Sequence, residues 1–314
     1  MTRLRDVTQT FMQTMMSCEE KARLRYMELL RGPTTSALSV GSAVHLGFEL
    51  GSVEEALKLL EEDRGPSYLE HEAEALQKDR ATVQAIVEGG MALWSGWPSV
   101  KERTFEVPFV NPATGHASTK HCFSGVFDGV FLPGELPPMP GVGGIGRSFG
   151  HNSSPVLLEI KTTSRLDSAY LERLELDWQV SSYLAAASVV YGEPVRHMVY
   201  RIAKKPSIRQ KKTETHAEFV VRLVEDYKSR PDFYFEEVVV SRTDDQIRRW
   251  WFEAWELHER ILRIENGGMT VRNSRHCLDF GRCTYFDLCR GAVGQEPFRV
   301  LDDAPPELRR KTTP

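Results

Sequence analysis

The sequence lacks the features that mark membrane-spanning, secreted or uniformly basic proteins. Its 314 residues contain no run of about 18 apolar residues, so no transmembrane helix is expected. The segment Met1–Asp6 lacks the apolar stretch of a secretion signal. A net charge of −4 excludes a uniformly basic nucleic-acid binder and confines any contact with a polyanion to a local patch. We therefore expect a soluble, cytoplasmic protein with no membrane partner.

Cysteine is also scarce, with five residues in the whole chain. In a reducing cytoplasm these residues are expected to be thiols or metal ligands rather than disulfides. The fold must then be stabilised by the packing of apolar side chains rather than by disulfide bonds. With 41% hydrophobic residues, the chain is long enough to bury a substantial core.

Two short apolar segments carry charge where a buried strand normally has none. Phe123–Phe131 and Val156–Thr162 are rich in β-branched and aromatic residues and are bounded by turn residues, which predicts strands. The first contains Asp128, and the second contains Glu159 and Lys161. Because side chains alternate along a strand, this glutamate and lysine share one face.

These residue types suit the hydrolysis of phosphodiester bonds. Two carboxylates on adjacent strands can hold a hard divalent cation such as magnesium or manganese. A neighbouring lysine can orient the attacking water and offset charge that develops on a phosphate. A helix expected over Asp167–Tyr191 places Gln179 and Tyr183 four residues apart, and hence on one face that can line the same cleft.

In their order along the chain, these residues resemble the PD-(D/E)xK nuclease superfamily, in particular its RecB-like and CRISPR-associated exonuclease branch and the related phage-encoded exonucleases. The resemblance spans about residues 11 to 290, and Phe127 stands where the family name has proline. The matching motifs are Gly41-x3-His45, Gly125-x2-Asp128, Glu159-Ile-Lys161 and Gln179-x3-Tyr183.

The resemblance implies an α/β fold with a restriction-endonuclease-like core, in which helices flank a mixed central β-sheet. It implies a metal-dependent DNA exonuclease that acts in recombination, repair or phage DNA processing, with DNA and a recombination or CRISPR-related protein as partners. The implied ligands of a magnesium or manganese ion are His45, Asp128, Glu159 and the backbone of Ile160. The implied catalytic set is Asp128, Glu159, Lys161, Gln179 and Tyr183.

Two other functions stay open at this point. One is a catalytically silent DNA-binding or assembly subunit that keeps the fold, but the complete set of acids and lysine argues against it. The other is a site-specific endonuclease of restriction type, which shares the chemistry and differs in cutting closed circular DNA at a fixed sequence.

We expect four regions along the chain. Residues 1–100 form an N-terminal helical region, 101–242 the nuclease core, 243–291 a helix with a cysteine cluster, and 292–314 a tail. In the first region, apolar residues recur at helical spacing from about Asp6 to Leu30. Within the core, alternation from Arg103 predicts an edge strand that pairs with the strand of Asp128.

Two further segments have unusual composition. Residues 132–155 contain 11 prolines and glycines among 24 residues, which predicts a loop. Their Gly141–Gly146 matches G-x-G-x-x-G, but the prolines around it leave no strand or helix for a dinucleotide site. In the helix expected over Asp244–Asn266, tryptophans at helical spacing are interpreted as core rather than as base-stacking residues.

One local run is strongly basic. From residue 196 to 212 there are seven basic residues and no acidic ones, and the run is either a solvated loop or a ridge that contacts phosphates beside the cleft. These residues are Arg196, Arg201, Lys204, Lys205, Arg209, Lys211 and Lys212.

Three cysteines lie close together near the C-terminus. Cys277, Cys283 and Cys289 are each separated by five residues, and Cys18 is a distant fourth, so the four suit an iron–sulfur cluster or zinc. The resemblance implies a four-iron four-sulfur cluster with a structural role, although the first gap is wider than the family's usual two residues. Cys122 is expected to lie in the core.

Overall fold

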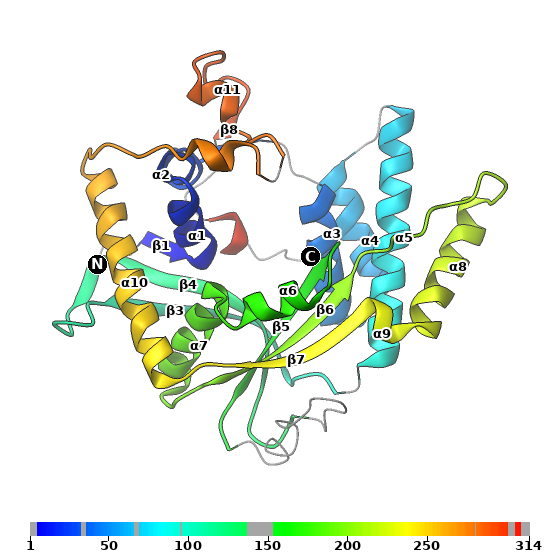
Figure 1. Ribbon diagram of the computed structural model, residues 1–314, viewed down its shortest axis with the longest axis horizontal. Helices are drawn as coiled ribbons and strands as arrows, with labels where there is room; N and C mark the ends of the chain where they lie inside the picture. Colours follow the sequence, from blue (N-terminus) through cyan, green and yellow to red (C-terminus); the bar gives the residue numbers. More distant parts are fainter. Residues whose placement is uncertain are drawn as a thin grey trace.

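A mixed β-sheet of six strands forms the centre of the molecule (Figure 1). The structure is a computed structural model and describes residues 5–32, 36–65, 69–94, 96–136, 153–279, 281–300 and 305–308. The strand order is β1-β4-β5-β6-β7, with β3 paired to β4 at one edge. The strands are β1 (Arg5–Thr8), β3 (Val100–Val110), β4 (Ala117–Phe131), β5 (Val156–Thr163), β6 (His197–Lys204) and β7 (Phe235–Ser241).

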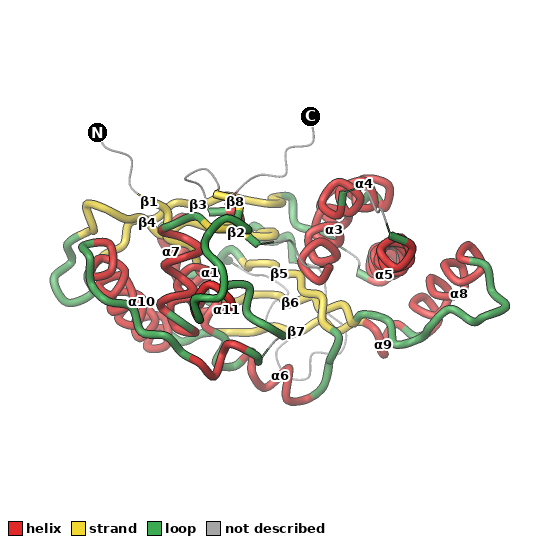
Figure 2. The backbone as a smooth tube through the Cα atoms, turned by 90° about the horizontal axis from the view of Figure 1, so that it is seen from above, coloured by secondary structure: helices red, strands yellow, loops and turns green. Residues whose placement is uncertain are grey.

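Helices cover both faces of this sheet, so the expected α/β architecture with flanking helices is confirmed. Alternation along β5 separates the two cores: Leu157 packs on the side of α7 and α10, and Leu158 on the side of α3, α5 and α8. Figure 2 shows α3, α4 and α5 side by side, with α8 beyond α5. The helices are α1 (Gln9–Ser17), α2 (Glu19–Ala22), α3 (Ser36–Leu50), α4 (Val53–Arg64), α5 (Glu70–Leu93), α6 (Ser168–Leu174), α7 (Trp178–Tyr191), α8 (His216–Ser229), α9 (Pro231–Tyr234) and α10 (Asp244–Glu265).

One edge of β4 is shared by two different strands, which creates a fork in the sheet. Residues 121–124 of β4 pair in parallel with β1, and residues 129–131 pair in antiparallel fashion with β5. The opposite edge of β4 is occupied by β3. The short stretch of β4 between the two partners therefore faces an opening, and Asp128 lies at its end.

Several sequence expectations are confirmed. The strands β3 and β4 form the expected hairpin at the sheet edge. Trp250 is 1% exposed and belongs to the core of the molecule, as its helical spacing indicated. Within the described residues, no helix has the length and apolarity needed to span a membrane.

Other expectations are wrong in detail. Residues Arg5–Thr8 form a strand of the central sheet, so the N-terminal region is not purely helical. The helix expected over Asp167–Tyr191 is interrupted at residues 175–177, because the side chain of Asp177 accepts the N–H groups of Gln179 and Val180 and starts a new helix. Helix α10 packs into the main core.

A segment that follows η1 (Arg23–Met27) and a segment near the C-terminus meet in a small lobe with a core of its own. There β2 (Leu30–Arg31) pairs with β8 (Arg299–Val300), and the hydroxyl of Tyr285 donates to the carbonyl of Leu30 at 2.7 Å. The remaining short elements are η1, a π-helical turn (Arg23–Met27), η2 (Ser274–Cys277), α11 (Phe286–Cys289) and η3 (Pro306–Leu308). The glycine-rich motif at 141–146 lies outside the described residues.

Candidate active site

A cleft of about 480 Å³ opens at the fork of the sheet. It lies between the start of α1, helix α3, the open stretch of β4 and the end of β5, and η3 borders it as well. All the side chains predicted for the catalytic centre line it. They are His45, Asp128, Glu159, Lys161, Gln179 and Tyr183, together with the motif glycines Gly41 and Gly125.

Asp128 and His45 form one ion pair of this cleft. The imidazole Nδ1 of His45 lies 3.2 Å from Oδ1 of Asp128, and the N–H of Ile160 donates to Oδ2 at 2.8 Å. Burial opposes the charge of Asp128, but the adjacent His45, Lys161 and this backbone hydrogen bond outweigh it and hold the pKa of Asp128 below its usual value. Burial would lower the pKa of His45, yet the Asp128 carboxylate raises it overall.

Glu159 and Lys161 form the second ion pair. Glu159 is 2% exposed, and its Oε1 contacts Nζ of Lys161 and accepts a hydrogen bond of 2.9 Å from Nε2 of Gln179. Among the described residues, its Oε2 is a buried atom without a hydrogen-bond partner. Burial, followed by the charge of Asp128, raises the pKa of Glu159 to about 7.

Lys161 keeps its positive charge in this setting. Burial alone would lower the pKa of its ammonium group, but the neighbouring Glu159, Tyr200 and Asp128 together raise that pKa well above its usual value. A permanently protonated lysine donates hydrogen bonds and does not accept a proton. It is therefore suited to positioning a water molecule or a phosphate oxygen.

Tyr183 forms one wall of the cleft. Its ring centroid lies 5.9 Å from that of Phe105 and 5.7 Å from that of Phe127, so the aromatic core beneath β4 fixes its position. Burial raises the pKa of its hydroxyl, which stays protonated and available as a donor. Gly125 makes room for this packing, because a Cβ there would lie 2.6 Å from Cζ of Phe105.

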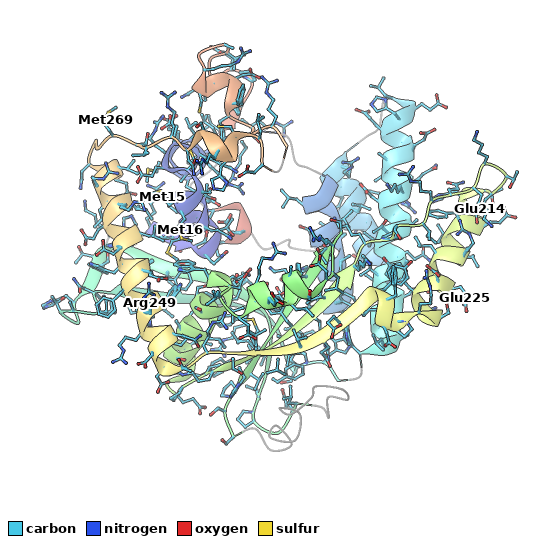
Figure 3. All side chains as sticks on the ribbon, viewed as in Figure 1. Met15, Met16, Glu214, Glu225, Arg249 and Met269 are labelled. Atoms are coloured by element: carbon cyan, nitrogen blue, oxygen red, sulfur yellow. The ribbon has the colours of Figure 1, made fainter. Side chains whose placement is uncertain are left out.

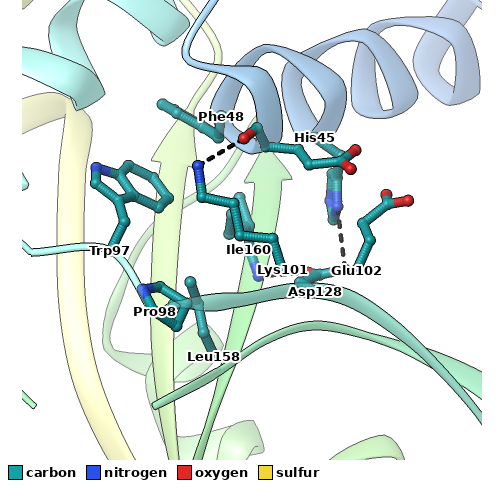
Figure 4. Close-up of a pocket in the computed structure, with 10 residues that line it drawn as sticks. His45, Phe48, Trp97, Pro98, Lys101, Glu102, Asp128, Leu158 and Ile160 are labelled. Atoms are coloured by element: carbon teal, nitrogen blue, oxygen red, sulfur yellow. Dashed lines mark hydrogen bonds and ion pairs between the residues drawn. The ribbon is translucent and has the colours of Figure 1, made fainter. Parts of the chain in front are cut away.

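Sequence reasoning missed Glu102, which is one of the residues that line this cleft. A smaller cavity of about 10 Å³ adjoins the cleft (Figure 4) and shares with it His45, Glu49, Glu102 and Asp128. Glu102 has a φ of 40°, a conformation that costs a non-glycine residue about 1–3 kcal/mol. In the sequence this glutamate looks like an ordinary solvent-facing position of an alternating strand.

The basic run does not form one continuous ridge. Arg201 is 1% exposed, pairs with Glu237 at 2.6 Å and lies over Trp97, so its prediction as a DNA contact is wrong. Arg196 pairs with Asp244 at 2.7 Å. At the base of the loop, Lys204 lies over the ring of Phe233 and Lys205 is half-buried; the exposed members are Arg209, Lys211 and Lys212. Figure 3 shows Glu214, just beyond this loop, next to α8.

The four candidate cluster cysteines are half-buried free thiols. Cys283 and Cys289 pack against the small core of the end lobe around Leu24, Leu30 and Tyr285. Burial, followed by the nearby Glu20, Cys283 and Cys18, raises the pKa of the Cys289 thiol. Among the described residues, no three of the four sulfurs lie within 4.8 Å of one another. A tetrahedral zinc site with bonds of about 2.3 Å requires spacings of about 3.8 Å.

A different group in the described part of the chain meets that spacing. Ligand atoms of Asp6, Glu106 and Cys122 lie within 4.8 Å of one another. Cys122 is 1% exposed, and burial raises the pKa of its thiol to about 12. Its Sγ donates to Oδ1 of Asp6 at 3.6 Å. We interpret Cys122 as a protonated core thiol, as the sequence indicated.

The chain is similar to a solved structure, but no family model or curated protein matches it. The chain is similar to a crystal structure from Eubacterium rectale that bears the name "Putative exonuclease". The similarity covers 91% of this chain and 87% of that chain, with 16% sequence identity and a TM-score of 0.47.

Proposed function

We propose that the protein is a divalent-metal-dependent DNA exonuclease of the PD-(D/E)xK type. The observation that carries the proposal is the buried, unpartnered Oε2 of Glu159 in a cleft that also contains Asp128, His45 and a protonated Lys161. Burying a carboxylate oxygen without a partner raises the free energy of the folded state unless a cation or a hydrogen-bond donor contacts it. The donor set, oxygen-rich with one imidazole, suits magnesium or manganese.

The residues of the cleft have different roles in this proposal. His45, Asp128, Glu159 and the carbonyl of Ile160 would hold the ion, which supplies Lewis acidity and lowers the pKa of water when bound. Gln179 holds Oε1 of Glu159 and so fixes the direction of Oε2. Lys161 positions the attacking water and stabilises negative charge on the phosphate, and Tyr183 offers a hydroxyl from the wall of the cleft.

The test is digestion of end-labelled linear DNA with magnesium or manganese. We expect progressive shortening from an end, loss of at least about 100-fold in rate in Asp128→Ala and Lys161→Ala, and no change in Asp245→Asn, an exposed carboxylate on α10. Binding of DNA without cleavage by the wild-type protein would instead identify a silent subunit. Cleavage of closed circular DNA at one sequence would identify a restriction-type endonuclease.

We further propose that Cys18, Cys277, Cys283 and Cys289 hold a four-iron four-sulfur cluster with a structural role. Support comes from the packing of Cys283 and Cys289 against one small core and from the closeness of Cys18 to Cys289. Protein purified without oxygen should then be brown and contain about four iron atoms per chain, and Cys289→Ala should lose them. Cys122→Ala is the matched control. Colourless protein with stoichiometric zinc contradicts the proposal.

A further inference from the structure

Three arginines gather around Tyr26 and the β2–β8 pair of the small lobe. Cζ of Arg25 lies 5.3 Å from the ring centroid of Tyr26, and Cζ of Arg31 lies 5.6 Å from the same centroid. In the two-stranded sheet, Arg31 is directly opposite Arg299. Residues that face each other across an antiparallel pair have their side chains on the same face, so Arg299 extends the group. We call Arg25, Arg31 and Arg299 the lobe arginines.

Two irregular turns of the backbone bring Arg25 and Arg31 to one tyrosine. On a regular α-helix, residues six positions apart point to different sides. Here η1 is a π-helical turn, and Leu29 has a φ of 58°, in the left-handed region. Tyr26 is 3% exposed and stacks on Phe11 with a centroid distance of 4.4 Å, so the core of the molecule fixes the ring to which both arginines are held.

Other arginines of this region have acidic partners. Arg23 pairs with Glu20 and Glu28. Arg5 pairs with Glu265 at 2.6 Å. Within the described part of the chain, none of the lobe arginines forms an ion pair, and two of them have a buried Nε atom without a hydrogen-bond partner. Their N–H donors are therefore available to an anion.

This crowding of like charge does not help the fold. Burial, followed by the charge of Arg25, lowers the pKa of Arg31, although Tyr26 and Glu307 oppose the shift. The facing of Arg31 and Arg299 across two strands is destabilising as well, because like charges directly opposite each other repel. An anion that binds between these groups would remove both repulsions, and guanidinium groups match the geometry of phosphate oxygens.

The lobe arginines lie next to one border of the candidate active site. Glu307 and Leu308 of η3 line the cleft, and the hydroxyl of Thr8 at the start of α1 donates to Oε1 of Glu307. Figure 1 shows η3 beside α1. The same Glu307 is close enough to Arg31 for its charge to affect that arginine. A polyanion that passes this border of the cleft therefore comes within reach of the group.

We infer that the lobe arginines form a phosphate-binding site, which holds the backbone of the DNA strand that enters the cleft. The inference rests on the proposed function, because the strand is the substrate of that cleft. The ligand class is a phosphodiester group. Contacts of this kind fix the position of the strand and do not read its bases.

The salt dependence of DNA binding tests this site. The full-length protein is titrated into fluorescein-labelled single-stranded or duplex DNA without divalent cations, and Kd is measured by anisotropy at several salt concentrations. The variant Arg31→Gln with Arg299→Gln removes the two facing charges, and Arg31→Lys with Arg299→Lys keeps them. Arg248→Gln with Arg249→Gln removes two exposed charges of α10 and is the matched control.

In the glutamine double variant of the lobe, the slope of log K against log salt should lose up to about 1.4 of its magnitude on a single strand, or about 1.8 on a duplex. The single variant Arg299→Gln changes only an exposed side chain and should give half this loss, which keeps the test usable if the double variant does not fold. The lysine variant and the α10 control should keep the wild-type slope. An unchanged slope in the lobe glutamine variants, or an equal loss in the α10 control, overturns the inference and leaves the proposed nuclease intact.

Calorimetric titration with inorganic phosphate distinguishes a DNA strand from a free anion. Phosphate binding that the glutamine double variant loses, together with an unchanged slope for DNA, overturns the inference and identifies a site for a small anion. A wild-type protein that binds no DNA overturns both the inference and the proposed function. Loss of slope in the lobe variants of a protein that does not cleave DNA with manganese supports the inference and overturns the nuclease alone.

Discussion

The backbone N–H of Ile160 donates a hydrogen bond to Oδ2 of Asp128 at 2.8 Å. Nearby, β4 and β5 are joined by regular pairing up to Gly129 and Leu158. A carboxylate thus satisfies a backbone donor at the point where the two strands separate. Since Glu159 and Lys161 are the neighbours of Ile160, this one hydrogen bond sets the distance between the two halves of the candidate site.

The hydrogen bond between Ile160 and Asp128 predicts different stabilities for Asp128→Asn and Asp128→Ala, although both variants lose the charge. Asp128→Asn keeps an oxygen that can accept the N–H of Ile160, whereas Asp128→Ala leaves that buried donor unpaired. We expect Asp128→Ala to be less stable than Asp128→Asn by about 1–3 kcal/mol in urea unfolding. Equal stability would show that water replaces the carboxylate at the fork.

Two motif glycines should respond in opposite ways to alanine. At Gly125 a Cβ would lie 2.6 Å from Cζ of Phe105, so Gly125→Ala should cost about 1–3 kcal/mol of folding free energy. At Gly41 a Cβ would lie 3.9 Å from its nearest neighbour, Oγ1 of Thr162, which is ordinary contact. Gly41→Ala in helix α3 should therefore stabilise the protein by about 0.5–1 kcal/mol. Urea unfolding of both variants compares them directly.

The strands that carry the candidate site were predictable from local pattern. Apolar residues bounded by turns marked Phe123–Phe131 and Val156–Thr162, and charge within them marked Asp128, Glu159 and Lys161. Strand β1 was not predictable, because four residues with little alternation become a strand only through pairing with residues 121–124, more than a hundred positions away.

The errors at single residues have the same origin in distant contacts. Arg201 belongs to a basic run, but its partners Glu237, Trp94 and Trp97 come from other elements that the sequence around it does not reveal. Glu102 looks like a solvent-facing position of a strand, and only the folded structure shows that it lines the cleft. Tertiary pairing decides which charges are buried and which enter the cleft.

Lowering the pH should reduce the free energy of unfolding, because His258 is buried in its neutral form. This histidine is 1% exposed, and burial together with the nearby His121 lowers its pKa to about 4, although Glu265 opposes the shift. In the unfolded chain its pKa is about 6.5, so the unfolded state binds the proton first as pH falls. Stability is complete above about pH 6.5 and falls by up to about 3 kcal/mol toward pH 4.

The variant His258→Gln isolates this effect from the acids that also titrate in this range. Glutamine can keep the contact that Nε2 of His258 makes with the hydroxyl of Ser118 at 3.0 Å. We expect the unfolding free energy of the wild type minus that of the variant to fall by about 3 kcal/mol from about pH 7 to pH 4, because only the wild type carries the titrating histidine. A difference that stays constant over this range contradicts a depressed pKa for His258.

The exposed end of the basic run should set the salt dependence of DNA binding if it contacts phosphates. Lys211 and Lys212 are exposed, whereas Lys204 and Lys205 are partly buried at the base of the loop. The slope of log K against log salt is negative, and each phosphate contact that is lost lowers its magnitude by about 0.9. The double variant Lys211→Ala with Lys212→Ala should therefore lower this magnitude by up to about 2 without changing sequence preference. The exposed residues Lys58 and Lys120 serve as a matched pair of controls. An unchanged slope in the first double variant identifies the run as a solvated loop, because a lysine that releases no counterions leaves the salt dependence as it was.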